Sequence, residues 1–433
     1  MFFKNYIQLN RILVCLIPFS LIFSIFIADL ILSFVSLFFV IYLIKEKKLG
    51  YLNNNFFKIF LIFFFLLISG SIFSEFKVLS IQKTLPYIRF GLFMVLIIYL
   101  LENDLKFKFF FLRSLLLCFF AIAIGLILQI LGLEFISESK PYSRYTSFFM
   151  DESIMGSYLM KLLPLSMALL FALNFKKIYI ILFLLLSSLM ITISGERSAA
   201  ILLFLFIIIF IFFTNFAKFK YKVIIFLCIT SLISSSLYFF PEVKFRIIDR
   251  TLYQLGIIEP DSDYVEIQVN EKYLAVVREE HFIPLKYYLM FSSSLKMFKD
   301  DPLFGKGVKT FRILCNDKRY FLKKSYKAFK DKSDDFYKGY TGLTSCSTHP
   351  HNYYIQLLAE TGLFTFIIFL SIFIFSIYRF FNEVFIYRKL IYVALFLNFF
   401  PFLFTGSLFN NFISILFFIP IGFIKFKSNK DYK

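Results

Sequence analysis

The chain has 433 residues, of which 59% are hydrophobic and only 17% are charged, and its mean hydropathy is +0.78. This composition excludes a soluble globular protein and indicates a protein that lies in lipid. The formal net charge of +19 accompanies 68 Phe residues and no Trp. The codon usage of an AT-rich genome accounts for this bias, so the charge by itself indicates no basic function, and we expect no nucleic acid partner.

Apolar runs long enough to cross roughly 30 Å of hydrocarbon recur along most of the sequence. Each run must be helical, because its backbone cannot form hydrogen bonds with lipid. The sequence therefore predicts an all-α polytopic membrane protein with about twelve transmembrane helices. The predicted helices cover residues 10–28, 29–44, 56–74, 80–101, 109–132, 153–173, 178–194, 198–214, 222–240, 361–379, 390–406 and 411–425.

The distribution of basic residues predicts the orientation of these helices. With the N-terminus in the cytoplasm, every short cytoplasmic loop carries Lys or Arg, as the positive-inside rule requires. An odd number of helices would break this pattern, so both termini are expected in the cytoplasm. The basic residues on that side are Lys45, Lys47, Lys48, Lys58, Lys106, Lys108, Lys176, Lys177, Lys218, Lys220, Lys222, Arg379, Arg388, Lys389, Lys425, Lys427, Lys430 and Lys433.

Three regions follow from this topology. Residues 1–240 hold the first nine helices, residues 241–350 form one large hydrophilic loop on the far side of the membrane, and residues 351–433 hold a re-entry helix and the last three helices. Two cysteines, Cys315 and Cys346, lie in the loop. In an oxidising compartment they could form a disulfide, and the alternative is two free thiols.

The strongest local signal lies where the large loop re-enters the membrane. Residues 347–362 read Ser-Thr-His-Pro-His-Asn-Tyr-Tyr-Ile-Gln-Leu-Leu-Ala-Glu-Thr-Gly and contain His349 and His351. Pro350 suits the first position of a helix, which predicts His351 in the first turn, near the positive end of the helix dipole. There the pKa of an imidazole falls, and its neutral form can act as a general base. The alternative is a pair of histidines that cap a helix at the membrane interface.

Arginines on the same side of the membrane form the second signal. Arg197 lies in the turn Ser-Gly-Glu-Arg-Ser, and Arg246 and Arg250 follow the ninth helix at i, i+4 spacing, hence on one face if that helix continues. Arg144 lies on the same side. Such residues oppose the positive-inside trend and favour a bound anion, because guanidinium groups hold phosphate oxygens with paired hydrogen bonds. The alternatives are contact with lipid headgroups or ion pairs with neighbouring acidic residues.

Other charged residues carry weaker signals. Lys83, Arg89 and Lys161 fall within or beside predicted helices, where a charge is costly and often functional. The acidic pair before Pro302 is more typical of a turn than of a metal site. We therefore expect no metal.

The segment His-Asn-Tyr-Tyr-Ile-Gln-Leu-Leu-Ala-Glu-Thr-Gly at 351–362 resembles the signature of the O-antigen ligase and O-antigen polymerase family, and the large loop before it is similar too. Three weaker similarities follow in order. They are an Arg-containing loop at 144–158, a Ser-Arg turn at 194–198, and a segment with Pro and Gly-x-Gly at 295–311. Asp151 and Glu152 stand where the family commonly has Pro-Asn.

This resemblance implies a membrane glycosyltransferase of the GT-C type, without a cofactor, in the bacterial inner membrane with its large loop in the periplasm. Its partners would be membrane lipid, a glycan carried on undecaprenyl diphosphate, and an acceptor, which is lipid A-core for ligases and another lipid-linked repeat for polymerases. The enzyme must stabilise the leaving group and deprotonate the acceptor hydroxyl. The implied catalytic residues are His351 and Arg197, and the implied substrate-binding residues are Arg246, Arg250, Arg144, His349 and Asn352, of which Asn352 has helix capping as its alternative role.

Ligase is the favoured interpretation, because about twelve helices with the loop between helices nine and ten resemble ligases, and polymerase is the nearest alternative. A flippase or transporter would place polar or broken helices at the bilayer midplane. Most predicted spans are uniformly apolar, which counts against transport. A receptor built on the large loop would leave the histidines and arginines dispensable.

Overall fold

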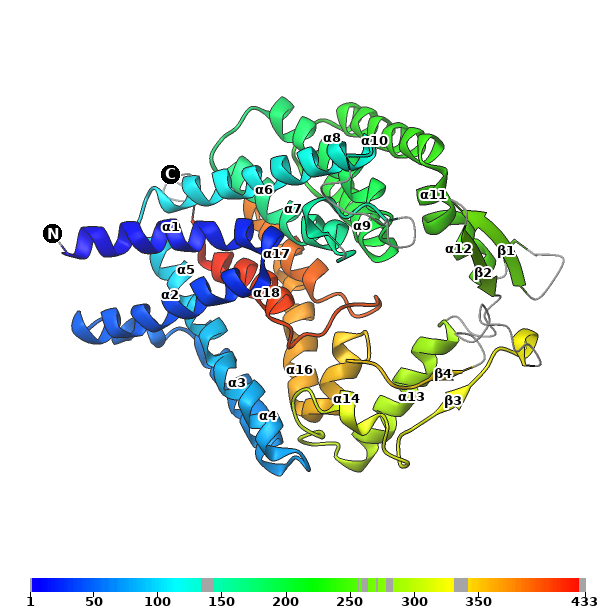
Figure 1. Ribbon diagram of the computed structural model, residues 1–433. Helices are drawn as coiled ribbons and strands as arrows, with labels where there is room; N and C mark the ends of the chain where they lie inside the picture. The colour runs from blue at the N-terminus through cyan, green and yellow to red at the C-terminus, as the bar shows by residue number, and fades with distance from the viewer. Residues whose placement is uncertain are drawn as a thin grey trace.

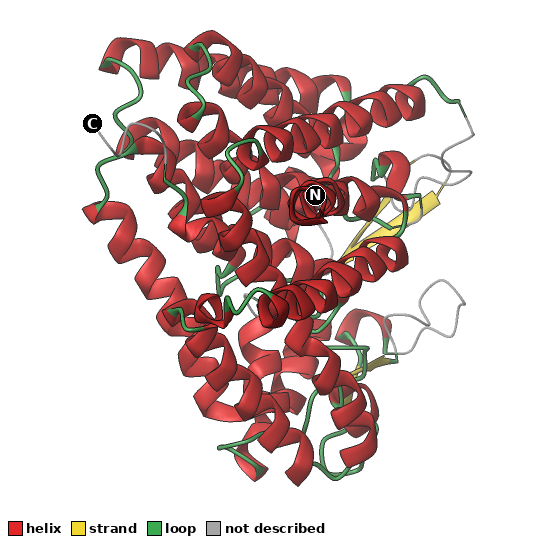
Figure 2. Cartoon of the chain, turned by 90° about the vertical axis from the view of Figure 1, so that its left-hand side faces the viewer, coloured by secondary structure: helices red, strands yellow, loops and turns green. Residues whose placement is uncertain are grey.

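Helices make up most of the protein, and short strands occur only in two antiparallel pairs of the described part (Figure 2). The first pair joins β1 (Tyr264–Val269) to β2 (Lys272–Val277), and the second joins β3 (Lys323–Lys324) to β4 (Leu343–Thr344). The structure is a computed structural model, and it describes residues 2–133, 144–150, 152–255, 257–258, 264–269, 272–277, 283–330 and 342–427.

Within the described residues, eight helical segments are long and apolar enough to cross a membrane. They confirm a polytopic helical membrane protein, while the number of spans stays a prediction. The eight are α1 (Phe2–Phe23), α2 (Ile25–Lys45), α3 (Asn55–Phe73), α4 with α5 (Lys77–Thr84 and Ile88–Asn103), α6 (Phe107–Ile130), α7 (Met155–Ala172), α10 (Phe219–Phe239) and α16 (Tyr353–Asn382). Shorter helices in the predicted spans are α8 (Lys177–Ile193), α9 (Arg197–Phe213), α17 (Ile386–Asn398) and α18 (Asn411–Gly422).

α7 lies at the centre of the bundle, where it packs against α6, α8, α9 and α17. In its apolar window 83% of the residues are buried, against 28% in α10, which is therefore peripheral. Many large apolar side chains on the outer helices are exposed, such as Phe26 and Phe65. Such a surface is stable only in contact with lipid. Figure 1 shows both termini at the left of the bundle and the β1–β2 pair at the right.

Two predicted boundaries are wrong in an informative way. The first break falls at Ser24, whose hydroxyl caps α2 by accepting a hydrogen bond from the Ile27 N–H at 3.3 Å. Residue 29, the predicted start of the second helix, therefore lies inside α2. Near the C-terminus, α17 ends at Asn398, because Pro401 cannot continue a helix. The loop that follows, residues 399–410, contacts the histidines described below.

The large loop is partly helical and packs on the bundle. It contains α11 (Pro241–Lys244), a π-helix (Phe245–Asp249), α12 (Arg250–Gln254), α13 (Leu285–Asp300) and α14 (Phe311–Leu314). α13 packs along α16, and the two share a small second core that includes Met290, Met297 and Ala359. A disulfide between Cys315 and Cys346, whose Cα atoms lie 5.0 Å apart, joins the two ends of this core.

Two glycines allow the loop backbone to touch α16. Gly362 has φ +77 and bends α16, and a Cβ there would lie 2.2 Å from the carbonyl oxygen of Leu303. Across the contact, a Cβ on Gly305 would lie 2.3 Å from the Thr361 nitrogen. Backbone hydrogen bonds complete the junction, from Lys306 N–H to Ala359 O (2.9 Å), from Gly307 N–H to Glu360 O (2.8 Å) and from Leu363 N–H to Pro302 O (2.8 Å).

Gly362→Ala is expected to lower the melting temperature of the detergent-solubilised protein by several degrees, because left-handed strain alone costs about 1–3 kcal/mol. The added methyl group would also separate the two backbones. Gly50→Ala is the matched control, since a Cβ at that position meets nothing within 4 Å. Equal melting temperatures for the two variants would contradict this account of the junction.

Candidate active site

The turn between α8 and α9 is anchored to the start of α7 by Glu196. Its buried carboxylate accepts hydrogen bonds from the Gly156 N–H (2.7 Å), the Ser157 N–H (3.2 Å) and the Ser157 hydroxyl (2.5 Å). A carboxylate at the N-terminal end of a helix satisfies backbone donors that would otherwise lack partners. Burial raises the pKa of Glu196, and the hydrogen bond from Ser157 and the charge of Arg144 oppose that rise. Arg197, the first residue of α9, is thereby held at this end of the bundle.

The chain after α10 brings two more arginines to the same turn. Arg246 donates a hydrogen bond from Nε to the carbonyl of Gly195 at 3.1 Å, and Arg197 donates from its guanidinium to the side-chain oxygen of Gln254 at 2.6 Å. The condition under which Arg246 and Arg250 would share one face, a continuous α-helix, is not met, because residues 245–249 form a π-helix. A π-helix changes which side chains share a face, and such segments are frequent at functional sites.

The segment that carries Arg144 is held in place by a side-chain amide of a membrane helix. Gln129, near the end of α6, accepts hydrogen bonds from the Thr146 and Ser147 N–H groups at 2.9 and 3.0 Å. The Ser147 hydroxyl also donates to Ile122 O at 2.9 Å. These bonds replace the internal hydrogen bonds that the irregular segment lacks. They fix the start of the segment beside the turn that carries Arg197.

These four residues, Arg144, Arg197, Arg246 and Arg250, are called the arginine cluster. Burial, followed by the positive charges of Arg144, Arg250 and Arg197, lowers the pKa of Arg246 to about 9, and the charge of Glu196 opposes this. Among the described residues, the buried Nε atoms of Arg144 and Arg250 have no hydrogen-bond partner. Buried donors without partners are costly, and an anion held between these guanidinium groups would satisfy them.

His349 and His351 lie just before α16. The helix begins at Tyr353 with Asn352 as its N-cap, so the prediction that His351 occupies the first turn is wrong. His351 has φ +61, and its carbonyl accepts a hydrogen bond from the Thr405 N–H at 2.7 Å. Its Nε2 lies 3.3 Å from the Ser347 hydroxyl, and the Nε2 of His349 lies 3.3 Å from Thr405 O. The two imidazole rings are 4.1 Å apart.

Burial, then the charges of His349 and Lys286, lower the pKa of His351 to about 4, while a hydrogen bond with Thr405 opposes the shift. The pKa of His349 is also lowered, first by burial and then by the charges of Arg312 and Lys309. The direction agrees with the prediction for His351. The main cause is burial, followed by the charges of neighbouring basic groups. Both imidazoles are neutral near pH 7 and can accept a proton.

Tyr287 of α13 connects the histidines to the arginine cluster. Its ring stacks on Phe404 at 4.0 Å and meets the His351 ring edge-on at 5.6 Å. Tyr287 also lies close enough to Arg144 to affect the pKa of that guanidinium. The Ser198 hydroxyl donates to Phe404 O at 3.2 Å, so the start of α9 and the loop after α17 meet here. No sequence pattern marks Tyr287, because it lies far from both motifs in the chain.

Asn352 and two further polar residues hold the histidine segment in place. Asn352 accepts from the Tyr354 and Ile355 N–H groups and donates to the carbonyls of Pro401 and Leu403, so its amide is engaged within the protein. Gln356 donates to Glu360 and to the Ser407 hydroxyl, both at 2.9 Å. Gln356 and Glu360 were missed in the sequence, although polar residues at i, i+4 on an apolar helix are a usable signal.

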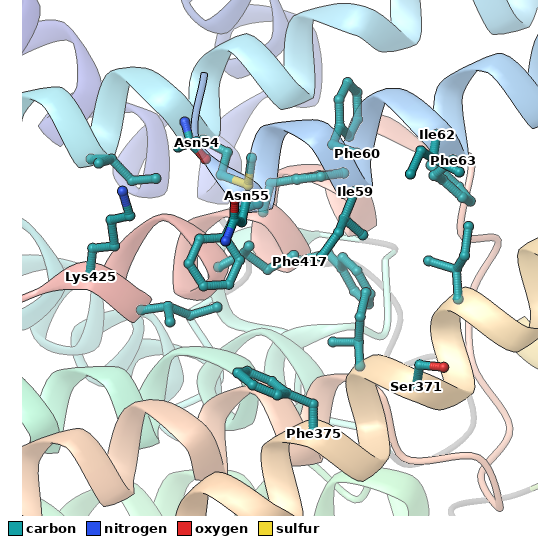
Figure 3. A pocket seen from close by; sticks show the side chains of 18 of the residues that line it. Asn54, Asn55, Ile59, Phe60, Ile62, Phe63, Ser371, Phe375, Phe417 and Lys425 are labelled. Carbon is teal, nitrogen blue, oxygen red and sulfur yellow. The ribbon is translucent and has the colours of Figure 1, made fainter. Parts of the chain in front are cut away.

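A large cavity lies away from these residues. It has a volume of about 1010 Å³ and lies between α3, α16 and α18, with a largely apolar lining that includes Phe60, Phe375 and Phe417 (Figure 3). Asn54, Asn55 and Lys425 also line it. The candidate histidines and the arginine cluster do not line this cavity.

Residues 182–370 match the family model for O-antigen ligase. This part of the chain is similar to the O-antigen ligase family. The resemblance seen in the sequence motifs is thereby confirmed, and the match supports an enzyme of the O-antigen ligase and polymerase type. A comparison with curated proteins gave no match.

The O-antigen ligase domain contains most of the site. Arg197, Arg246, Arg250, both histidines and Asn352 fall within residues 182–370, and the junction between Gly305 and Gly362 falls there too. Arg144 lies outside the matched range and joins the site only through the fold. The family match does not separate ligases from polymerases.

Proposed function

We propose that the chain transfers a glycan from undecaprenyl diphosphate to an acceptor hydroxyl at the periplasmic face of the bacterial inner membrane. The favoured acceptor is lipid A-core, as for a ligase. A polymerase that extends lipid-linked repeats would use the same donor and the same chemistry. The observation that carries the proposal is a cluster of four arginines joined through Tyr287 to a neutral, partly buried His351.

The arginine cluster would hold the diphosphate of the donor. The bond between the sugar's anomeric carbon and the diphosphate oxygen breaks, and the leaving group gains negative charge. Guanidinium groups stabilise that charge with paired hydrogen bonds, and the buried Nε atoms of Arg144 and Arg250 offer donors for this purpose. Undecaprenyl diphosphate then leaves with both electrons of the broken bond.

His351 would take the proton from the acceptor hydroxyl as the new bond to the anomeric carbon forms. A hydroxyl is a weak acid, so proton transfer must accompany bond formation. The edge-on contact with Tyr287 orients the imidazole, and the hydrogen bond from the Thr405 N–H to the carbonyl of His351 fixes the backbone that carries it. His349 and Asn352 act as positioning residues in this scheme, with the His349 ring tilted against that of His351 and Asn352 at the start of α16.

The proposal is tested by incubating the purified protein with undecaprenyl-diphosphate oligosaccharide and either lipid A-core or a second lipid-linked repeat, followed by mass spectrometry. Glycan on lipid A-core would establish a ligase, and lengthened lipid-linked chains would establish a polymerase. An absence of both products with a donor and acceptors from the native host would overturn the proposal.

The pH dependence should differ between free and substrate-bound enzyme. Protonation of His351 abolishes its action as a base, so activity falls as pH drops through its pKa, which is about 4 in the free protein. A bound diphosphate stabilises the imidazolium and raises that pKa. The acid limb of kcat/KM should therefore lie near pH 4, and the acid limb of kcat at a higher pH. Measurements of kcat and kcat/KM between pH 3.5 and 8 check this prediction. It would be contradicted if the acid limbs of the two profiles coincided, or if the acid limb of kcat lay at the lower pH.

A further inference from the structure

A second group of basic side chains lies next to the histidines and takes no part in the proposed transfer step. Lys83 of α4, Arg89 of α5 and Lys309, between α13 and α14, line a pocket of about 210 Å³ together with Gln82 and Asn411. These residues come from segments that are distant in the sequence. We call Lys83, Arg89 and Lys309 the lysine pocket.

The lysine pocket carries excess positive charge. Arg89 is compensated, since its guanidinium lies 2.8 Å from Asp29 and donates to Asn411 at 3.2 Å. The charge of Lys309 is less well compensated. Burial and the charges of Arg312, Lys83 and Arg89 lower its pKa. Among the groups that act on it most strongly, only Glu360 opposes this shift. Basic groups held together at this cost are typical of a site for an anion.

The lysine pocket and the arginine cluster are carried by different elements, and both have members near the histidines. Lys309 and Arg312 lie close enough to His349 for their charges to act on its imidazole, and that ring is 4.1 Å from His351. Figure 1 shows α4 and α14 in the lower half of the view, whereas α9 and α12, which carry two of the clustered arginines, lie in the upper half. The two basic groups are therefore carried by different parts of the fold.

We propose that the lysine pocket binds a phosphate group of the acceptor and so brings the acceptor hydroxyl to His351. This inference rests on the proposed glycosyl transfer. An acceptor with phosphate groups is repelled by the donor diphosphate in a site of low dielectric, and two separate basic groups offset that repulsion. The phosphate is either a substituent of an acceptor glycolipid or the diphosphate of a second lipid-linked repeat.

The test compares wild-type protein with Lys83→Gln, Lys309→Gln and the double variant, in nanodiscs of phosphatidylcholine. Lys296→Gln is the matched control, because Lys296 is exposed on α13 and does not line the pocket. The acceptors are phosphorylated lipid A-core, the same glycolipid after phosphatase treatment, and an undecaprenyl-diphosphate repeat. Binding of each fluorescently labelled acceptor and the KM values of donor and acceptor are measured.

We expect the pocket variants to weaken binding of the phosphorylated acceptor and raise its KM about tenfold, as loss of a charged hydrogen bond does. The donor KM should change less than twofold. With phosphatase-treated acceptor, the variants and the wild type should bind equally weakly. If the variants lose affinity only for lipid A-core, its phosphates are the ligand of the pocket. If they lose affinity only for the lipid-linked repeat, its diphosphate is the ligand. Either result supports the proposal.

Three results would overturn the inference. In the first, the variants lose the same binding affinity for phosphorylated and phosphatase-treated glycolipid while binding of the lipid-linked repeat is unchanged. In the second, only the donor KM rises. In the third, the variants differ from the wild type only when phosphatidylglycerol is added to the nanodiscs. The last result would assign the pocket to membrane headgroups. Acceptor binding needs no turnover, so a protein that binds phosphorylated acceptor through the pocket but transfers nothing would contradict the proposed function and leave the pocket assignment intact.

Discussion

Replacing His351 with asparagine is expected to reduce kcat by a factor of about 10²–10⁴, the usual contribution of a general base. Asparagine accepts the left-handed backbone conformation found at His351, where φ is +61. The backbone hydrogen bond from Thr405 is also retained, because it involves only the carbonyl of residue 351. The loss should therefore come from the missing imidazole and leave the fold unchanged.

The measurement combines turnover with two controls on folding. His351→Asn and His351→Ala should both insert into the membrane, and His351→Asn should keep the melting temperature and donor affinity of the wild type. His351→Ala is expected to lose activity to a similar degree, with some loss of stability because alanine tolerates positive φ less well. Near-normal turnover in His351→Asn would exclude His351 as the base and leave it as a structural residue.

Replacing Arg250 with lysine is expected to lower kcat by a factor of about 10²–10³, although the charge is kept. Lysine cannot donate two parallel hydrogen bonds to one phosphate group, and it lacks the Nε donor that has no partner among the described residues. Arg197→Lys should also fail, because an ammonium group cannot reproduce the paired hydrogen bonds that the guanidinium at the start of α9 offers to a phosphate. Both variants should retain their fold.

Arg113→Lys is the matched control for these substitutions. Arg113 is exposed on α6, where its guanidinium lies over the ring of Phe109. The assay is single-turnover transfer at saturating donor, which separates a slower chemical step from weaker binding. Turnover within twofold of wild type for Arg250→Lys would show that charge alone suffices and would remove paired hydrogen bonding from the mechanism.

Several features of the fold were predictable because the forces that set them act locally. A long apolar run must be helical in lipid, and each of the twelve predicted segments overlaps a helix of the described structure. The errors arose where one side chain decides a boundary. The hydroxyl of Ser24 caps α2, Pro401 lies just beyond the end of α17, and Asn352 caps α16 two residues after His351.

The candidate site was predictable as a set of residues and not as an arrangement. Histidines and arginines in an apolar chain are conspicuous, so His351 and the arginines could be chosen from type and spacing. The π-helix at 245–249 and the loop at 399–410 carry no comparable pattern, because each depends on contacts with segments far along the chain. Tyr287 and Lys309 were missed for the same reason.

By itself, the sequence determined that this protein lies in a membrane, that its helices cross it repeatedly, and that two histidines and several arginines are its chemical candidates. Hydropathy and residue type are properties of short segments, and the bilayer permits few backbone structures. Only the tertiary structure placed Arg144, Tyr287 and His351 together and brought Lys83 and Lys309 into one pocket. Those contacts join residues distant in the chain, and they depend on the packing of α13 on α16 and on the close approach that Gly305 and Gly362 permit.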